Sequence, residues 1–220
     1  MITTEYYRQL PHWQHIGATF FVTFNLRGAI PHDVYERLQE EKELAFSRIE
    51  KSGSNTDQLY KEHIRHFARV DHILDTCQHG PNWLAHAEVA DLVKTKLHEF
   101  DNIHYELLAY CIMPNHVHIV VDMAIQLDLL NPSEAIHAEN YTQLFLVLKR
   151  IKGGSARVAN LFLNRTGAFW QPEYYDHYVR DSAELNRIIN YVLQNPVKAG
   201  LTENWQDWPH TYLSPRYHGL

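Results

Sequence analysis

The sequence has 220 residues, of which 45% are hydrophobic and 21% are charged, so it is long enough and apolar enough to form one domain with a core. No apolar run approaches the roughly 18 residues of a membrane span, and no apolar stretch follows a basic leader as it would in a signal peptide. The two cysteines fit no metal or disulfide spacing. We therefore expect a cytoplasmic protein with no membrane partner. The net charge of −6 argues mildly against a general nucleic-acid binder, because phosphate contacts need lysine and arginine.

The first half of the chain predicts one strand followed by helices. Residues 17–26 are rich in phenylalanine, threonine and valine, which favours a strand. Pro31 and the acidic residues that follow it predict a helix at residues 31–50. The spacing of apolar residues predicts two more helices, at residues 59–76 and 87–100. The polar run 51–57 is expected to be a loop. We expect the segment around 50–80 to be a helical insertion.

Two more strands are predicted near the middle of the chain, over residues 104–113 and 116–123, joined by a tight turn at Pro114-Asn115. Strands and helices therefore alternate only in part along the chain. This order favours an α+β fold in which the helices pack on one side of a small antiparallel sheet.

A long helix is predicted over residues 141–163, with a break at Gly153-Gly154. Residues 141–172 contain no acidic residue but several basic ones: Lys149, Arg150, Lys152, Arg157 and Arg165. The chain can thus be acidic overall and still present one basic face to DNA phosphates, although a solvated helix face is the alternative. Phe169 and Trp170 follow in a loop, either as stacking platforms for bases or as core residues.

Two histidines, His116 and His118, lie in the second predicted strand within the run CIMPNHVHIVVDM. Residues two apart in a strand point to the same face, so the two imidazoles project side by side. Such a pair supplies two ligands of a metal site. Two satisfied polar residues beside the core are the alternative reading.

The last long helix is predicted over residues 181–194, with Asp181 as its N-cap and an end or a kink at Asn195-Pro196. Tyr191 and Asn195 are four residues apart and share one flank beside the apolar stripe of this helix. From that flank a hydroxyl and an amide oxygen could reach a site on the sheet. The spacing alone does not separate Tyr191 from the other tyrosines.

These residues together resemble a known family. The segment PNHVH at 114–118 is similar to the histidine–hydrophobic–histidine motif of the HUH single-strand DNA transposases that use one catalytic tyrosine. More narrowly, the chain resembles the REP-associated tyrosine transposases over nearly its full length. The segments that carry this resemblance are LPHWQHIGATFFVTFNL from residue 10, HGPNWL from 79, LLAYCIMPNHVHIVV from 107, FWQPEYYDHYVRD from 169 and YVLQNPVKAGL from 191.

The resemblance implies a role for individual residues. His116 and His118 match the metal-binding histidines, Tyr191 matches the nucleophile, and Asn195 matches the position that supplies a third ligand, where the wider group often has glutamine. The implied fold is a single ferredoxin- or RRM-like α+β domain over residues 1–220, with the histidines on a central strand and the tyrosine helix packed across it. The implied metal is Mg²⁺ or Mn²⁺; two histidines and an amide suit Mn²⁺ or Zn²⁺ at least as well as Mg²⁺.

The implied reaction is cleavage and rejoining of single-stranded or hairpin DNA through a 5′-phosphotyrosine intermediate. A divalent cation would act as a Lewis acid on the phosphate, and the tyrosine would split one hard step into two. Lys149, Arg150, Lys152, Arg157 and Trp170 are expected to contact the DNA.

Two other functions stay open at this point. One is a domesticated module that binds DNA hairpins without productive cleavage. The other is a metal-dependent phosphodiesterase in which water replaces the tyrosine. Relatives include monomers and dimers, so the resemblance leaves both oligomeric states possible.

Overall fold

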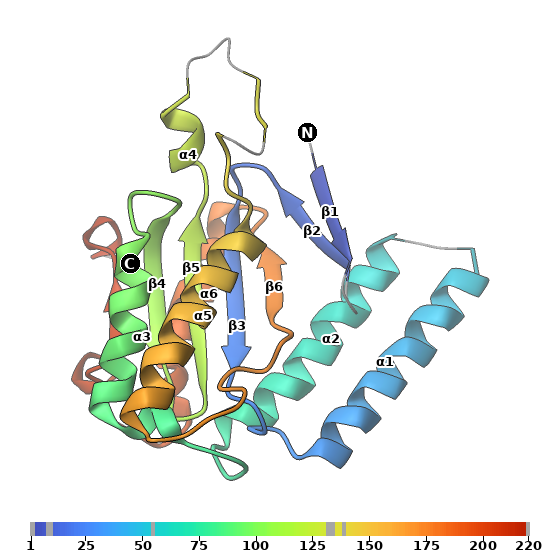
Figure 1. The fold of residues 1–220 in the computed structure, drawn as a ribbon. Coiled ribbons are helices and arrows are strands. Elements are labelled where there is room, and N and C mark those ends of the chain that lie inside the picture. The colour runs from blue at the N-terminus through green and yellow to red at the C-terminus, as the bar shows by residue number, and fades with distance from the viewer. Residues whose placement is uncertain (1–2, 8–10, 54–55, 131–134, 138–139, 219–220) are drawn as a thin grey trace.

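A computed structural model describes residues 3–7, 11–53, 56–130, 135–137 and 140–218 of the chain (Figure 1). Five strands form an antiparallel sheet in the order β6-β3-β5-β4-β7. Their bounds are Thr19–Asn25 for β3, Glu106–Ile112 for β4, His116–Asp122 for β5, Tyr175–Tyr178 for β6 and Thr211–Leu213 for β7. A separate antiparallel pair consists of β1, Thr3–Tyr7, and β2, Pro11–His15.

The central strand, β5, alternates between the two faces of the sheet. Val117, Ile119 and Val121 belong to the larger apolar core. Val120 belongs to the smaller core on the other face, which is also the face of the two histidines. Because β3 pairs with one edge of β5 and β4 pairs with the other, the backbone that carries the histidines is fixed on both sides.

Two helices cover the face of the larger core, α3 at Ala87–Glu99 and α5 at Leu144–Phe162, and they lie side by side in front of the sheet in Figure 1. They bury apolar side chains at helical spacing against the strands. The main contributors are Val89, Val93, Leu97, Leu144, Val147, Leu148 and Ile151.

The opposite face is covered by α6 at Ser182–Lys198 and by α2 at Thr56–Asp75, which pairs with α1 at His32–Lys51 (Figure 1). Val192 and Leu193 of α6 are buried there, and Phe67 of α2 packs against the same apolar cluster. The predicted α+β class with an antiparallel sheet is confirmed, although helices cover both faces rather than one.

The remaining elements are short. They are α4 at Ile125–Asp128 and three 3₁₀ helices, η1 at Trp83–Ala85, η2 at Trp205–Asp207 and η3 at Pro215–Tyr217. None of the helices in the described ranges combines the length and the apolar composition that a membrane crossing requires.

The predicted break at Gly153-Gly154 is wrong, because α5 runs through both glycines. A glycine inside a helix costs about 1 kcal/mol relative to alanine, and the apolar side chains that α5 buries outweigh that cost. Gly154 also has a use in packing. A Cβ at this position would lie 3.1 Å from Cε of Lys96 on α3, so the missing side chain lets the two helices approach.

The last helix also continues further than its sequence indicates. α6 begins as predicted, with the Asp181 side chain accepting a hydrogen bond from the backbone N–H of Glu184 at 2.8 Å. It does not end at Asn195-Pro196 but runs on through Pro196 to Lys198. Asn195 therefore stays on the helical face that Tyr191 occupies.

The helix α2 is held on the sheet by apolar contacts at two points. The ring of Phe67 stacks on Tyr175 of β6, with the ring centroids 3.6 Å apart. Leu74, near the C-terminal end of α2, is 1% exposed, and its carbonyl accepts a hydrogen bond from the Asn115 side chain at 3.1 Å. These contacts place the last turns of α2 directly beside the start of β5.

Replacing Leu74 with alanine should destabilise the protein by about 2–5 kcal/mol, because the change leaves a cavity beneath α2. Urea unfolding followed by circular dichroism measures the loss. Leu44→Ala on the neighbouring helix is the control; this leucine is 58% exposed, so the expected change stays within about 0.5 kcal/mol. Equal losses in the two variants would show that Leu74 does not anchor α2.

Candidate active site

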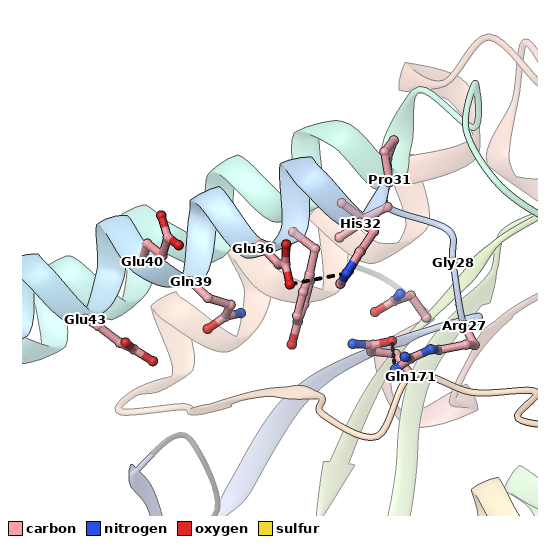
Figure 2. Close-up of a pocket in the computed structure, with 12 residues that line it drawn as sticks. Arg27, Gly28, Pro31, His32, Glu36, Gln39, Glu40, Glu43 and Gln171 are labelled. Carbon is pink, nitrogen blue, oxygen red and sulfur yellow. Dashed lines mark hydrogen bonds and ion pairs between the residues drawn. The ribbon is translucent and has the colours of Figure 1, made fainter.

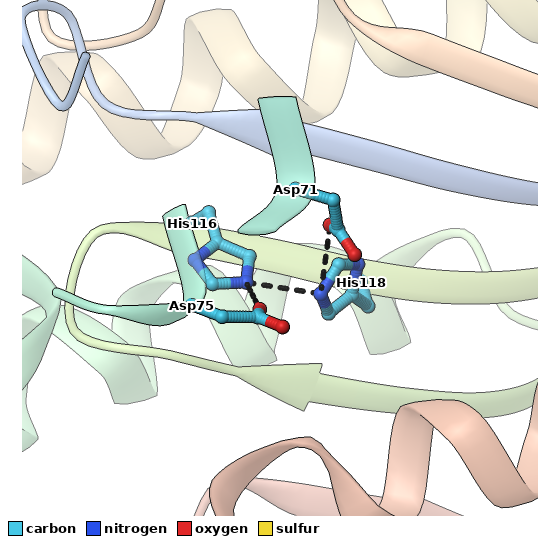
Figure 3. A group of neighbouring side chains, drawn as sticks. All are labelled: Asp71, Asp75, His116 and His118. Carbon is cyan, nitrogen blue, oxygen red and sulfur yellow. Dashed lines mark hydrogen bonds and ion pairs between the residues drawn. The ribbon is translucent and has the colours of Figure 1, made fainter. Parts of the chain in front are cut away.

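The two histidines of β5 lie side by side beneath α2, as Figure 3 shows. Both side chains are completely buried. Their Nε2 atoms are 2.9 Å apart, and their ring centroids are 4.6 Å apart. Thus the strand period does bring the two imidazoles together, as the sequence predicts.

The Nδ1 atoms of the two histidines, which point away from each other, are hydrogen-bonded to neighbouring side chains. Nδ1 of His116 donates to the Asn115 side-chain oxygen at 2.7 Å, which leaves Nε2 of His116 as an acceptor. Nδ1 of His118 lies 2.7 Å from the Thr23 hydroxyl, which can either donate or accept. Thr23 therefore allows both tautomers of His118, including the one in which both Nε2 atoms present lone pairs to a cation.

The helix α6 brings Tyr191 and Asn195 to the same place. Both side chains come from the flank that the sequence indicates, and Asn195 donates to the Tyr191 hydroxyl oxygen at 3.3 Å. The Tyr191 ring packs edge-on against His118, with the ring centroids 5.5 Å apart. Lys198 lies over the Tyr191 ring, 4.6 Å from its centroid, and so places a positive charge beside it.

Two carboxylates from α2 complete the site, and sequence reasoning did not include them. Oδ1 of Asp75 lies 3.6 Å from Nε2 of His116, and Oδ1 of Asp71 lies 3.7 Å from Nε2 of His118 (Figure 3). One donor atom from each of these four residues lies within 4.8 Å of the others. The sequence did contain a signal, since like charges four residues apart on a helix repel each other unless something binds them.

Burial sets the protonation of the cluster. It lowers the pKa of His116 to about 3 and that of His118 well below its usual value, so both imidazoles are neutral at pH 7. Burial, together with the neighbouring Asp75, raises the pKa of Asp71 to about 8. Burial likewise raises the pKa of Asp75. The site thus favours a cation that would relieve both carboxylates.

Two buried oxygen atoms support this fit to a cation. Oδ1 of Asp71 and Oδ1 of Asn195 find no hydrogen-bond partner among the described residues. Buried polar atoms are normally paired, so two acceptors without a partner beside two imidazole nitrogens fit the coordination of a cation. Nitrogen and oxygen donors together suit Mn²⁺, and the carboxylates improve the fit to Mg²⁺ over that of the histidines and amide alone.

The residues predicted to bind DNA lie elsewhere. Lys149, Arg150, Lys152 and Arg157 belong to α5, which covers the opposite face of the sheet from the histidines. Lys149 and Arg157 are exposed. Lys152 donates to the carbonyls of Gln171 and Pro172 at 2.8 and 2.9 Å.

Trp170 is also on the α5 side of the molecule. It is 6% exposed, and its indole N–H donates to the Ser155 hydroxyl at 3.0 Å. The ring lies in the larger core, where it packs edge-on against Phe24. Its faces are therefore not presented to a base in this structure.

An open cleft of about 610 Å³ lies between α1 and the end of β3 (Figure 2). Asn25 lines it and pairs in register with His116, so the cleft begins one strand away from the histidines. Its outer wall carries the carboxylates of Glu36, Glu40 and Glu43 on α1. This negative wall disfavours the passage of a phosphate backbone along α1.

Comparisons with known proteins find a family model, related sequences and a similar fold. A family model described as "Transposase IS200 like" matches residues 72–195. A putative REP-associated tyrosine transposase of Haemophilus influenzae is 29% identical over 107 residues, which cover 49% of this chain and 58% of that protein. The REP-associated tyrosine transposase of Escherichia coli K12 is 35% identical over 40 residues, or 18% of this chain and 24% of that protein. The matches thus span only part of each curated relative.

A solved structure of a REP-associated tyrosine transposase bound to a REP hairpin has a similar fold. The TM-score is 0.50 at 16% sequence identity, and the alignment covers 94% of this chain and 82% of the other. At that identity the likeness concerns the fold alone.

Mn²⁺ should raise the melting temperature, and the rise should be larger at about pH 8 than below neutrality. Asp71 is protonated below its raised pKa, so a cation must displace that proton at lower pH but not at higher pH. Differential scanning fluorimetry with and without Mn²⁺ measures the effect.

His116→Ala and Asp75→Asn should each reduce this rise, whereas the matched control Asp57→Asn, an exposed aspartate on the same helix, should retain it. A rise that is unchanged in His116→Ala would place the cation elsewhere.

Proposed function

Because this chain belongs to the IS200-like transposase family, we propose that it cleaves and rejoins single-stranded or hairpin DNA through a covalent bond to Tyr191. The observation that carries the proposal is the convergence of Tyr191 with the buried pair His116 and His118. In that arrangement a nucleophile lies beside a cation site, which is what phosphodiester transesterification requires.

Tyr191 is the residue we propose as nucleophile. Its ring is fixed between Phe21 and His118, with centroid distances of 5.9 and 5.5 Å, and its hydroxyl is hydrogen-bonded. A fixed ring limits the positions that the attacking oxygen can take, which lowers the entropic cost of the reaction. Another tyrosine on the same face of the sheet, Tyr175 of β6, instead stacks on Phe67.

His116, His118, Asn195 and Asp75 are the residues that we propose to hold a divalent cation, Mg²⁺ or Mn²⁺. When bound, such an ion supplies Lewis-acid polarisation of a phosphate oxygen and orients the scissile group. The chain itself keeps both imidazoles neutral, as metal binding needs. Asn115 fixes the tautomer of His116 through its hydrogen bond to Nδ1.

We further propose that the exposed basic side chains of α5 bind the sugar–phosphate backbone of the DNA. The similar solved structure is bound to a REP hairpin, and a hairpin has a duplex stem as well as a single-stranded loop. Since α5 and the catalytic residues lie on opposite faces of the sheet, the stem and the scissile strand would contact different faces. The whole chain would act as one domain, with a helical insertion around residues 50–80 that contains α2.

Tyr191→Phe should abolish the covalent protein–DNA adduct, with a loss of more than about 1000-fold, because phenylalanine has no oxygen to attack phosphorus. The assay incubates the protein with labelled single-stranded hairpin oligonucleotides and Mn²⁺ and separates the products on a denaturing gel. Tyr174→Phe is the control and should still form the adduct.

Other results of this assay would select another function. Cleavage that survives in Tyr191→Phe would indicate hydrolysis by water. Hairpin binding without any adduct in the unaltered protein would indicate a domesticated binding module.

Combined replacement of Lys149 and Arg150 by glutamine should weaken hairpin binding and should reduce the slope of log affinity against log salt by about 2, or about 1 for each lost phosphate contact. Fluorescence anisotropy over a series of salt concentrations measures both quantities. Replacement of Arg48 and Lys51, two basic residues exposed on α1, is the matched control. If both double variants lower the slope equally, α5 is not the DNA-binding face.

A further inference from the structure

The carboxylate of Asp71 contacts the hydroxyl that the proposed function requires as nucleophile. The Tyr191 hydroxyl donates a hydrogen bond to Oδ2 of Asp71, across 120 residues of sequence. Asn195 approaches the same hydroxyl from the other side, with its amide donating at 3.3 Å. The tyrosine proton therefore points at Asp71, and Asp71 touches the reacting atom itself.

The carboxylate of Asp71 is buried without full pairing of its two oxygens. It is 5% exposed, and its second oxygen finds no hydrogen-bond partner among the described residues. A buried carboxylate without full pairing costs free energy, and such costs are concentrated at functional sites. Asp75, one helical turn further on, differs because it accepts from the Asn195 amide at 3.2 Å.

The hydroxyl of Tyr191 needs a group that removes its proton. The Tyr191 hydroxyl donates a hydrogen bond to Asp71 and accepts one from the Asn195 amide, so it carries its proton in the resting site. A protonated phenol attacks phosphorus effectively only if its proton leaves during the attack. In the described part of the chain, the contact to Asp71 is the hydrogen bond that this hydroxyl donates.

We propose that Asp71 is a further catalytic residue, which orients the Tyr191 hydroxyl and accepts its proton as the oxygen attacks phosphorus. The proposal rests on the proposed transesterification. The phenol oxygen forms its bond to phosphorus while the bond from phosphorus to the 3′ oxygen breaks. The proton passes from Tyr191 to Oδ2 of Asp71 and then to the departing 3′ oxygen, so that atoms and charges balance.

The helix α2 thereby gains a catalytic role. Asp71 comes from the helical segment that the sequence marks only as an insertion, and Figure 3 shows it beside His118 on the central strand. Its neighbour Asp75 lies in the same cluster but does not contact the hydroxyl. The pair therefore provides a matched comparison between a carboxylate that accepts from the Tyr191 hydroxyl and a carboxylate of the same cluster that does not.

The test compares Asp71→Asn with Asp75→Asn in the full chain, using the hairpin oligonucleotide and Mn²⁺ at about pH 9, where the Asp71 carboxylate is ionised. Asp71→Asn should slow adduct formation by about 100-fold or more in a single turnover, and excess Mn²⁺ should not restore the rate. Asp75→Asn should lose Mn²⁺ affinity and should regain its rate in excess Mn²⁺. A rate for Asp71→Asn within about 3-fold of the unaltered protein, or one restored by Mn²⁺, would overturn the proposal.

A second measurement separates proton transfer from packing. Replacing Tyr191 by 3,5-difluorotyrosine gives a more acidic phenol, which depends less on a base; it should therefore restore part of the rate that Asp71→Asn loses. No restoration would argue that Asp71 is only structural. Asp71→Asn keeps the size of the side chain and removes a buried charge, and its melting temperature checks that it folds.

A ¹⁹F NMR measurement on the fluorinated Tyr191 also distinguishes failure of this inference from failure of the proposed function. If the unaltered chain makes no adduct with any oligonucleotide, the transesterification is wrong. The ¹⁹F resonance of fluorotyrosine at position 191 still reports the contact, and it should shift more in Asp71→Asn than in Asp75→Asn. An equal or absent shift would show that Asp71 does not hold the hydroxyl.

Discussion

The placement of one buried and one partly buried carboxylate against two neutral imidazoles is the constraint around which this molecule is arranged. Removing a carboxylate from water is expensive, and two such groups one helical turn apart also repel each other. Asp71 and Asp75 nevertheless lie beside the histidines, because α2 is held on the sheet by Phe67 and Leu74. Apolar contacts therefore sustain an electrostatic arrangement that would not form on its own.

The sheet supplies the rigidity that this arrangement needs. β5 is paired on both edges, so neither histidine can retreat from the carboxylates above it. The Nδ1 atoms of the two histidines are hydrogen-bonded to Asn115 and Thr23, which are themselves buried. α6 then adds Tyr191 and Asn195 from a third direction. The site is thus formed by elements that meet only in the folded chain.

The sequence allowed part of this site to be predicted because the relevant patterns are local. A strand alternates with period two, so His116 and His118 had to share a face. A helix repeats every 3.6 residues, so Tyr191 and Asn195 had to share a flank. The resemblance to the REP-associated tyrosine transposases agrees with the family match over residues 72–195.

The carboxylates of α2 were missed for a different reason. Periodicity shows that residues 59–76 form a helix, but it does not show which face of the sheet the helix covers. The same limit applies to α5. Its sequence does not show that its basic residues lie on the opposite face of the sheet from the histidines. The short strands β6 and β7 were missed because strands of four and three residues are too short to show an alternation of apolar and polar side chains.

The position of α2 over β5 has a consequence for the timing of any reaction. His116 and His118 expose no surface, so under the proposed function a phosphodiester would reach them only after a covering helix such as α2 had moved. The observed rate would then be the intrinsic rate multiplied by the fraction of molecules in that open state. Strands that bind weakly would leave the opening equilibrium unchanged and would escape cleavage. DNA whose binding energy favours the open state would reach Tyr191, so selectivity would arise before any bond is broken.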